Sequence, residues 1–441
     1  MLNRILSLIK KIIPAKLFKG LQRPYHFMLA KLAALVYGYP ADKMIVVGVT
    51  GTSGKSSTCY FIAQILEKAG LEVSMTTTTL FKIAEKEWLN DKKMTMLGRF
   101  ALQKLLRKMV RAGCEVAVIE ATSQGIEQFR HLGINWDILV FTNLYPEHIE
   151  AHGGFENYKR AKGKLIEYLI KCKHKKFVET RHGASLHGVV NKKTIIVNLD
   201  DEHAEYYLSF KADEKIGFNE SGVWGLESRK KIFQIQNSRF KIHLLGDYNL
   251  YNVLAALSVA EALAVETDQD LTYLKPLPGR LEFIENNRGI KILIDYAFEP
   301  EAIGKLYETL KQVEHKKIIH ILGSAGGGRD KSRRPALGRL VAKNADIVIV
   351  TNEDPYDENP MEIINQVSAG AEEIRDKRYE LGILKILDRR KAIRKALELA
   401  GAGDLVLITG KGAEQAICIE NSKMIPWDDR QVVREELDKL S

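Results

Sequence analysis

The sequence predicts an α/β protein with two domains, each built around a mostly parallel sheet, and a short helical arm before them. Short β-branched apolar runs alternate with helical stretches over residues 45–277, and the same alternation returns over residues 278–441. Strands that alternate with helices form parallel sheets covered by helices on both faces. Pro276 and Pro278 in the segment LKPLPGR interrupt any continuing element, so we place the domain boundary there.

The strands are predicted from apolar runs rich in Val and Ile. In the first domain these runs are MIVVGVT (44–50), CEVAVIE (114–120), DILVFTN (137–143) and KTIIVNL (193–199). In the second domain they are KILIDYA (291–297), KIIHILG (317–323), ADIVIVT (345–351) and DLVLITG (404–410). Residues 56–69 and 102–112 have helical periodicity between strands.

Composition is typical of a soluble globular protein. The 441 residues are 45% hydrophobic and 28% charged, and no apolar run approaches the ~20 residues that span a bilayer. No secretory signal is evident. The four cysteines have neither metal-ligand spacing nor a disulfide framework, which suits a reducing cytoplasm. We expect a cytoplasmic monomer.

The net charge of +10 is concentrated in an arm over residues 1–44, which has eight basic residues against Asp42, a net +7. A general nucleic-acid surface would need basic patches on the folded domains, so nucleic-acid binding is not expected. Within the arm, residues 2–13 have apolar positions at helical spacing and end at Pro14. This basic amphipathic helix either packs on the body of the protein or contacts an anionic membrane surface, at the inner face of the membrane.

A glycine-rich loop follows the first predicted strand, in the order strand, GTSGKSS, helix. Gly48, Gly51 and Gly54 would let the backbone turn and aim N–H groups at phosphates, with the helix N-terminus adding a favourable dipole. The sequence therefore predicts a P-loop ATPase domain over 45–277, whereas 278–441 is Rossmann-like. A chance glycine-rich turn is the alternative. The predicted ATP contacts are Gly51, Thr52, Gly54, Lys55, Ser56 and Ser57, with Lys55 on the β/γ-phosphates and Ser56 on Mg²⁺.

The form GVTGTSGKSS resembles the Mur ligases and the folylpolyglutamate synthetases. The later segment LYPEHIEAHGGFENYKRAKGKL (144–165) resembles a Mur ligase segment that carries a metal-binding histidine and a carbamylated lysine. The resemblance implies that Glu120 and His148 hold a second Mg²⁺ and that Lys162 is carbamylated, so these residues join Lys55 as catalytic candidates. Taken alone, His148 reads as a structural residue, and Glu147 replaces the usual aspartate.

Three further segments resemble the nucleotide-side motifs of the family: LLGDYNLYNVLAAL (244–257), PGRLEF (278–283) and ILIDYAFEP (292–300). They imply ATP contacts from Asn249, Asn252, Arg280 and Asp295. Phe298 stands where the family usually has histidine. An aromatic ring can stack on adenine, but it loses a polar contact.

The C-terminal half resembles the family throughout, and the resemblance covers about residues 45–441. It implies that Arg334, Gly410 and Glu414 contact the incoming amino acid, although Ala413 replaces a usual histidine. Members that add meso-diaminopimelate have an arginine where this chain has Tyr356. A phenol cannot replace a guanidinium that pairs with a carboxylate, whereas the neighbouring Glu353 and Asp354 suit the distal ammonium of lysine or another diamine. A solvent-facing acidic turn is the alternative.

The resemblance also implies that Thr95, Thr122, Ser123 and Arg130 contact the acidic muramoyl peptide. Family members that add the third residue begin with a uridine-nucleotide domain, and the P-loop here starts too early to leave room for one. Two outcomes stay open: the arm at 1–44 substitutes for that domain, or the acceptor is membrane-linked.

The implied activity is an ATP-dependent amide-bond ligase in peptidoglycan precursor synthesis. It would add a diamino acid, L-lysine or meso-diaminopimelate, to UDP-N-acetylmuramoyl-L-alanyl-D-glutamate through an acyl phosphate. One alternative is the same chemistry on another acceptor, such as a lipid-linked muramoyl peptide or a folylpolyglutamate. Another is a nucleotide-binding protein that has lost catalysis, suggested by Phe298 and Ala413.

Overall fold

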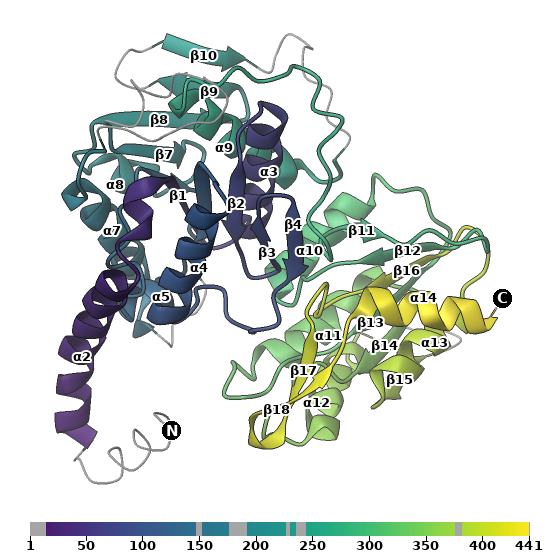
Figure 1. Ribbon diagram of the computed structural model, residues 1–441. Helices are drawn as coiled ribbons and strands as arrows, with labels where there is room; N and C mark the ends of the chain where they lie inside the picture. The colour runs from purple at the N-terminus through teal and green to yellow at the C-terminus, as the bar shows by residue number, and fades with distance from the viewer. Residues whose placement is uncertain are drawn as a thin grey trace. The chain divides into compact units, whose positions relative to one another are not determined.

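The computed structural model describes residues 15–146, 152–175, 192–225, 230–234, 244–374 and 382–440. These cluster into two compact units (Figure 1). The first unit draws on Met1–Trp88, Met94–Leu244 and Tyr248–Lys275, and the second on Leu89–Lys93, Leu245–Asp247 and Pro276–Ser441. Each unit has its own large sheet. The predicted α/β class is confirmed, whereas the helix predicted over residues 2–13 lies outside the described residues.

The sheet of the first unit has the strand order β10-β9-β8-β7-β6-β1-β5-β2-β3-β4. Its central strands from β8 to β2 pair in parallel, and antiparallel strands extend it at both edges. The strands are β1 (Ile45–Thr50), β2 (Val73–Thr76), β3 (Leu80–Ile83), β4 (Lys86–Leu89), β5 (Val116–Glu120), β6 (Ile138–Phe141), β7 (Thr194–Asn198), β8 (Glu214–Asn219), β9 (Gly222–Gly225) and β10 (Lys230–Gln234).

Every residue of β1, β5, β6 and β7 is buried, as expected for parallel strands covered on both faces. The helices of this unit are α2 (Ala15–Val36), α3 (Lys55–Lys68), α4 (Arg99–Arg111), α5 (Ser123–Glu127), α7 (Phe155–Lys171), α8 (Ala204–Leu208) and α9 (Asp247–Ala262), with the 3₁₀ turn η1 (Pro40–Lys43). In register, Val49 of β1 lies beside Glu120 of β5. The carboxyl ends of both strands therefore meet at the edge where the glycine-rich loop begins.

The helix α2 has two unlike faces. Ala30, Ala33 and Ala34 are buried, and the helix packs on α4. By contrast, Met28 and Leu35 are more than 60% exposed. This exposed apolar face was not predicted from the sequence. Among the described residues no helix is long and apolar enough to cross a membrane.

The second unit contains a six-stranded sheet in the order β11-β12-β16-β13-β14-β15, parallel except for β11, and a separate hairpin of β17 and β18. The strands are β11 (Glu282–Phe283), β12 (Lys291–Ile294), β13 (Ile318–Leu322), β14 (Ile347–Thr351), β15 (Ile383–Ile386), β16 (Leu405–Ile408), β17 (Ala416–Ile419) and β18 (Lys423–Pro426). The helices are α10 (Pro300–Leu310), α11 (Arg333–Asn344), α12 (Pro360–Glu372), α13 (Arg389–Leu399) and α14 (Asp429–Leu440), with the 3₁₀ turn η4 (Glu420–Ser422).

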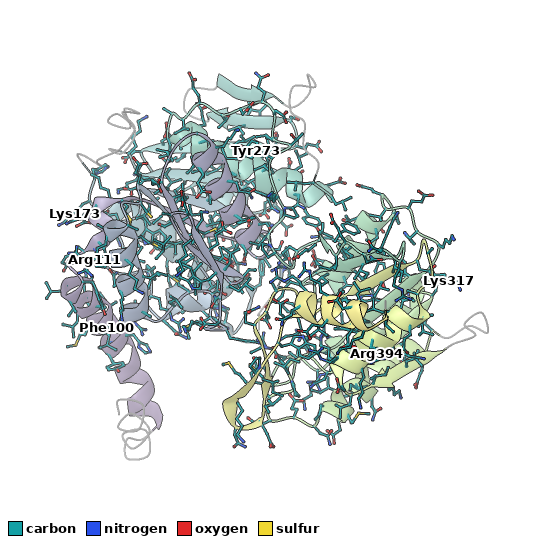
Figure 2. The ribbon with its side chains drawn as sticks, turned by 45° about the vertical axis from the view of Figure 1, so that its right-hand side comes forward. Phe100, Arg111, Lys173, Tyr273, Lys317 and Arg394 are labelled. Atoms are coloured by element: carbon teal, nitrogen blue, oxygen red, sulfur yellow. The ribbon has the colours of Figure 1, made fainter. Side chains whose placement is uncertain are left out.

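Two separate cores lie on the two faces of this second sheet. Along β13, Ile318 and Leu322 belong to one core, whereas Ile319 and Ile321 belong to the other. Successive strand residues point to opposite faces, so both faces are buried under helices. Charged residues such as Arg111, Lys173, Lys317 and Arg394 are exposed on the outside of their units (Figure 2).

Candidate functional site

The loop between β1 and α3 has the conformation of a phosphate-binding loop. Its Gly51 and Gly54 have φ values of 151° and 76°. A Cβ on Gly51 would lie 1.9 Å from Thr142 Oγ1, and a Cβ on Gly54 would lie 2.4 Å from Asn252 Oδ1. The backbone is thus held against two neighbouring segments where only glycine fits, at the N-terminus of a 14-residue helix. The N-terminus of a helix favours a bound phosphate.

Gly48 does not shape this loop. It lies inside β1, where a Cβ would come within 2.7 Å of the Trp136 ring. Trp136 is completely buried, so the glycine makes room for the indole against the strand. The prediction that Gly48 helps the loop to turn is therefore wrong.

Hydrogen bonds of Lys55 and Thr52 stabilise the loop. The Lys55 ammonium donates a hydrogen bond to the Thr52 carbonyl oxygen over 2.6 Å. The hydroxyls of Thr52 and Tyr158 lie 3.1 Å apart, within hydrogen-bond distance. Ser57 follows in the first turn of α3 and is half-buried. A cation therefore stands beside the loop on which phosphate binding was predicted.

Glu120 connects the loop to the acceptor residues predicted from the sequence. The Ser56 hydroxyl donates to Glu120 Oε2 over 2.6 Å, and the backbone N–H of Thr78 donates to the same oxygen over 2.8 Å. The Thr78 hydroxyl donates to Glu120 Oε1 over 3.0 Å and lies 2.8 Å from the Thr95 hydroxyl. Ser56 and Glu120 thus present hard oxygen atoms, the donors that Mg²⁺ prefers.

Lys162 of α7 also reaches the loop. Its ammonium donates to the Gly51 carbonyl oxygen over 2.6 Å and lies 4.6 Å from the centroid of the Tyr158 ring. The whole residue is only 2% exposed. Three of the four predicted catalytic residues, Lys55, Glu120 and Lys162, therefore make hydrogen bonds within or directly onto residues 51–56.

The fourth catalytic candidate, His148, lies outside the described residues. Among the residues that are described, no group of three or more His, Cys, Asp and Glu side chains could hold a metal ion. A Mg²⁺ bound by Ser56 and Glu120 would therefore complete its shell with water and phosphate oxygens, as this cation commonly does.

Asn249 and Asn252 lie in the first turns of α9, beside the loop. The Asn252 Oδ1 atom accepts a hydrogen bond from the Thr58 hydroxyl over 3.2 Å, and its amide donates to Asn249 Oδ1 over 3.1 Å. Because Asn252 also stands where a Cβ on Gly54 would be, it positions the loop and the start of α3. A direct contact of either amide with the nucleotide stays a prediction.

The remaining acceptor candidates lie at the start of α5 or just after its end. Thr122 caps this helix, since its hydroxyl accepts from the Gly125 N–H over 3.1 Å. Ser123 Oγ and His152 Nε2 lie 3.0 Å apart. The Arg130 guanidinium donates to the Met96 carbonyl oxygen. Thr95 lies next to Met96 in the chain, so the four predicted acceptor residues gather in one region of the first unit.

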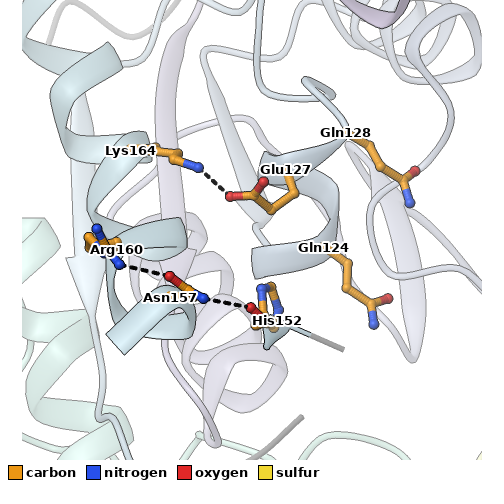
Figure 3. A pocket seen from close by; sticks show the side chains of 7 residues that line it. All are labelled: Gln124, Glu127, Gln128, His152, Asn157, Arg160 and Lys164. Atoms are coloured by element: carbon orange, nitrogen blue, oxygen red, sulfur yellow. Dashed lines mark hydrogen bonds and ion pairs between the residues drawn. The ribbon is translucent and has the colours of Figure 1, made fainter. Parts of the chain in front are cut away.

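A cavity of 680 Å³ lies between α5 and α7 (Figure 3). Its lining is polar and carries both signs of charge, and it consists of Gln124, Glu127, Gln128, His152, Asn157, Arg160 and Lys164. Lys164 pairs with Glu127 across it. His152 was not predicted as a site residue. Its signal was its place in the segment EAHGGF, four residues after the histidine that was chosen.

In the second unit, Arg280 and Asp295 lie beside Tyr296. The Arg280 guanidinium stacks 4.3 Å from the centroid of the Tyr296 ring, and Asp295 accepts from the N–H groups of Leu281 and Ala297 over 2.9 and 2.7 Å. Burial raises the pKa of Asp295, although Arg280 opposes the shift. The predicted ATP contacts of both residues remain predictions.

The Arg334 guanidinium is hydrogen-bonded to other residues of the second unit. The residue is 1% exposed, and its guanidinium donates to Gln366 over 2.7 Å and to Glu358 over 3.0 Å. The ring centroids of Phe298 and Tyr296 lie 5.4 Å apart, and the Arg333 guanidinium lies 5.6 Å from the centroid of the Phe298 ring.

Four charged groups form a compact cluster in the second unit. The Lys411 ammonium, which is completely buried, donates to Asp354 over 2.9 Å and to Glu414 over 2.6 Å. The Lys93 ammonium donates to the same two carboxylates over 2.9 and 2.8 Å. Burial would raise the pKa values of Asp354 and Glu414, but the two ammonium groups outweigh it and lower both. We call these four residues the carboxylate pocket. The alternative that the acidic segment is a solvent-facing turn is wrong, because Asp354 is only 7% exposed.

Glu353 and Tyr356 flank this pocket. Glu353 is 4% exposed, and its Oε2 has no hydrogen-bond partner among the described residues. Burial, followed by the nearby Asp354 carboxylate, raises the pKa of Glu353 to about 7. Gly410 packs directly on it, since a Cβ there would lie 2.4 Å from Glu353 Oε2. Tyr356 adopts a left-handed backbone with φ 53° and donates its N–H to the Cys418 carbonyl oxygen over 3.1 Å.

Comparisons with known proteins find a matching family profile in each of the two units. The family profile described as Mur ligase middle domain matches residues 49–260, and the profile described as Mur ligase, glutamate ligase domain, matches residues 279–412. A UDP-N-acetylmuramyl-tripeptide synthetase of Roseiflexus sp. (strain RS-1) is 36% identical over 430 residues, which cover 93% of this chain and 82% of the relative. A UDP-N-acetylmuramoyl-L-alanyl-D-glutamate–2,6-diaminopimelate ligase of Geobacter sulfurreducens is 30% identical over 427 residues, covering 91% and 80%.

Solved structures of other proteins have a similar fold. A UDP-N-acetylmuramoyl-L-alanyl-D-glutamate–2,6-diaminopimelate ligase is 26% identical with a TM-score of 0.52, and the match covers 90% of this chain and 79% of that one. The folate enzyme FolC of E. coli in complex with ADP shares the fold, with a TM-score of 0.59, 16% identity and coverage of 93% and 94%.

The fold and the phosphate loop therefore define an ATP-dependent ligase. The chain belongs to the Mur ligase family, whose members are ligases of peptidoglycan precursor synthesis, and the relatives named above include a tripeptide synthetase. One of those names gives 2,6-diaminopimelate as the amino acid and the other gives none, so the names leave the donor amino acid open.

Proposed function

We propose that this protein joins a diamino acid to the D-glutamate carboxylate of a muramoyl dipeptide, as in UDP-N-acetylmuramoyl-L-alanyl-D-glutamate, through an acyl phosphate. The observation that carries the proposal is the convergence of Lys55, Ser56, Glu120 and Lys162 on one phosphate-binding loop. Acyl transfer of this kind needs positioned phosphates and neutralised charge more than covalent help from the protein.

The loop residues fit ATP and Mg²⁺. Gly51 and Gly54 admit no side chain, so their backbone can approach phosphate oxygens closely. Lys55 would neutralise the β/γ-phosphates, and Ser56 and Glu120 would hold Mg²⁺ by their oxygen atoms. When bound, the cation supplies charge neutralisation at the transferring phosphoryl group. His148 remains a proposed ligand of a second Mg²⁺.

Lys162 is proposed to carry CO₂ as a carbamate. Its amine is buried beside the Gly51 carbonyl and Tyr158. A free ammonium there would repel a nearby cation, whereas a carbamate is an anion with two oxygen atoms. The carbamate therefore suits a place next to Mg²⁺ and the terminal phosphate.

The proposed reaction uses these positions. The acceptor carboxylate attacks the γ-phosphorus, the bond to ADP breaks, and an acyl phosphate forms. The amine of the diamino acid then attacks the acyl carbon, and inorganic phosphate leaves as the amide forms. The role proposed for Thr95, Thr122, Ser123 and Arg130 is to hold the acceptor peptide, so that its carboxylate points at the loop.

The carboxylate pocket supports a donor with a distal ammonium. Asp354 and Glu414 already accept hydrogen bonds from lysine ammonium groups, and Tyr356 cannot pair with a distal carboxylate as a guanidinium does. We therefore place L-lysine ahead of meso-diaminopimelate as the donor, with Arg334 and Gly410 as further donor-site residues.

The acceptor is either UDP-linked or lipid-linked. A basic arm over residues 1–44, followed by the exposed apolar residues Met28, Leu32 and Leu35 of α2, supports peripheral contact with an anionic membrane. Co-sedimentation with anionic liposomes that persists after deletion of residues 1–13 and substitution of these three α2 residues by serine would remove this part of the proposal.

The test of the proposed function is ADP release by the whole protein. Release should require both a muramoyl dipeptide acceptor and a diamino acid. Release with a folate acceptor would instead indicate folylpolyglutamate chemistry. Binding of ATP without any amine-dependent turnover would indicate a nucleotide-binding protein that has lost catalysis.

A further inference from the structure

Lys93 occupies the carboxylate pocket although it comes from a short separate segment. In the second unit, residues 89–93 pack with residues 276–441. The Lys93 ammonium lies 2.9 and 3.1 Å from the two oxygens of Asp354 and 2.8 Å from Glu414 Oε2. The side chain is only 11% exposed. Buried ammonium groups are stable only when they are paired in this way.

The charges of the pocket are balanced only because Lys93 is present. Asp354 and Glu414 carry two negative charges, and Lys93 and Lys411 carry two positive charges. A third ammonium, brought by an incoming diamino acid, would find both carboxylates already paired. A diamino acid that places its distal ammonium here would therefore add an unbalanced positive charge to these four residues unless one of the two lysines leaves.

Lys411 is the poorer candidate for leaving. It is completely buried and lies three residues from Glu414 in the same loop. Lys93, by contrast, has a left-handed backbone with φ 49°, a conformation that costs free energy for a residue with a side chain.

A second observation indicates that the pocket receives a ligand. Glu353 is more than nine-tenths buried beside Asp354, and its Oε2 lacks a hydrogen-bond partner among the described residues. A buried carboxylate oxygen without a partner is unfavourable. A Cβ on Gly410, the residue before Lys411, would lie 2.4 Å from Glu353 Oε2, so an ammonium group with three donors that enters beside Lys411 could satisfy this oxygen.

We infer that the Lys93 side chain occupies the subsite for the distal ammonium of the incoming diamino acid, so that Lys93 competes with the donor and sets its affinity. This inference rests on the proposed function, because it takes the donor to be a diamine. A lysine of the chain fits the pocket by its butylammonium group, which is also the side chain of free L-lysine. Lys93 is therefore a specificity-determining residue rather than a catalytic one.

The test compares Lys93→Ala with the matched control Lys92→Ala. Lys92 is the adjacent lysine, its side chain is 60% exposed, and it pairs only with Asp91 among the described residues. In Lys93→Ala, the KM for L-lysine should fall about tenfold with kcat little changed, because the competing side chain is gone. Lys92→Ala should behave as wild type. A KM that is unchanged or higher in Lys93→Ala would overturn the inference.

A second readout does not depend on turnover. Lys93→Ala should have a lower melting temperature than Lys92→Ala. Addition of n-butylammonium chloride should restore the melting temperature of Lys93→Ala, because it fits the space that the lysine side chain leaves, whereas sodium chloride at the same ionic strength should not. Failure of n-butylammonium to restore the melting temperature contradicts the inference. If no variant, wild type included, turns over L-lysine while n-butylammonium still restores the melting temperature, the proposed function has failed but the ammonium subsite stands.

The unsubstituted protein provides a third measurement, in case Lys93→Ala does not fold. Limited acetylation followed by peptide mass spectrometry should modify Lys92 readily and Lys93 poorly. Addition of L-lysine, with ATP and acceptor present, should increase the modification of Lys93 and leave that of Lys92 unchanged. Modification of Lys93 that does not respond to L-lysine would count against competition.

Discussion

The Ser56 hydroxyl donates a hydrogen bond to Glu120 Oε2 over 2.6 Å, although the two residues are 64 positions apart in the chain. This contact exists because β1 and β5 are parallel neighbours, so the start of α3 and the end of β5 meet at one edge of the sheet. Two oxygen atoms that could bind a metal ion therefore lie beside the phosphate loop, where a phosphate-bound Mg²⁺ would need them.

Replacement of Lys55 by methionine should abolish most of the activity. The methionine keeps much of the side-chain volume but removes the ammonium that would face the phosphates, so we expect kcat to fall by about a thousandfold or more. Steady-state ADP release measures this. Lys68→Met, at the other end of α3, is the matched control and should stay near wild type. A Lys55→Met enzyme within a few-fold of the control contradicts the role of Lys55.

Replacement of Glu120 by glutamine should weaken the response to Mg²⁺. The amide keeps the shape and still accepts a hydrogen bond from Ser56, but it loses the negative charge that would hold the cation. We expect the Mg²⁺ concentration for half-maximal rate to rise by about tenfold to a hundredfold. A Mg²⁺ titration of ADP release measures the change, with Glu127→Gln as the control. An unchanged titration would show that Glu120 is not a metal ligand.

Activity should depend on dissolved CO₂ if Lys162 is carbamylated. Protein stripped of CO₂ at mildly acidic pH should lose activity and regain it on addition of bicarbonate. With ¹³C-bicarbonate, wild-type protein should show a carbamate NMR signal that Lys162→Ala lacks. A fully active protein without that signal would mean that Lys162 acts as a plain amine.

Replacement of Tyr356 by arginine should shift the donor preference. A guanidinium can pair with the distal carboxylate of meso-diaminopimelate, which a phenol cannot. We expect the ratio of kcat/KM for meso-diaminopimelate over L-lysine to rise by at least about tenfold. Tyr356→Phe keeps the ring and should leave the ratio unchanged. If wild-type protein already prefers meso-diaminopimelate, the interpretation of Tyr356 is wrong.

Glu353 should make stability depend on pH. Burial raises its pKa from 4.5 to about 7, so between these values the folded state binds more protons than the unfolded state. The free energy of unfolding should therefore fall as pH rises from 4.5 to about 7, and level off above. The loss due to this group is on the order of 3 kcal/mol, since one pKa unit corresponds to about 1.4 kcal/mol. Urea unfolding of wild type and Glu353→Gln across this range measures it, and parallel pH profiles would contradict the assignment.

The long apolar strands of the fold were predictable from the sequence. All eight runs that predicted strands form strands, because parallel strands buried on both faces leave continuous Val and Ile runs. Other strands were missed. β4 and β18 are exposed or only partly buried, so burial imposes no apolar pattern on them, and the buried β2 is the short segment VSMT, which has two polar residues. The helix α2 was missed as well, since it follows Pro14 and contains Pro24.

The sequence proposed the glycine-rich loop and Glu120 as parts of one site, and the structure brings them into contact. Lys93 could not be found in this way. It stands beside Lys92 in a polar segment, and its partners Asp354 and Glu414 are 261 and 321 positions away. Only the folded chain distinguishes the buried lysine from its exposed neighbour.

The central claim is that the phosphate loop activates a carboxylate as an acyl phosphate. An acceptor with ¹⁸O at every oxygen of its D-glutamate carboxylates tests this directly, because the carboxylate that reacts passes one of its oxygens through the acyl phosphate to the phosphate that leaves. We predict one ¹⁸O atom in each inorganic phosphate released during turnover with ATP and L-lysine. Unlabelled phosphate, or ADP released at the same rate without acceptor, would contradict the account.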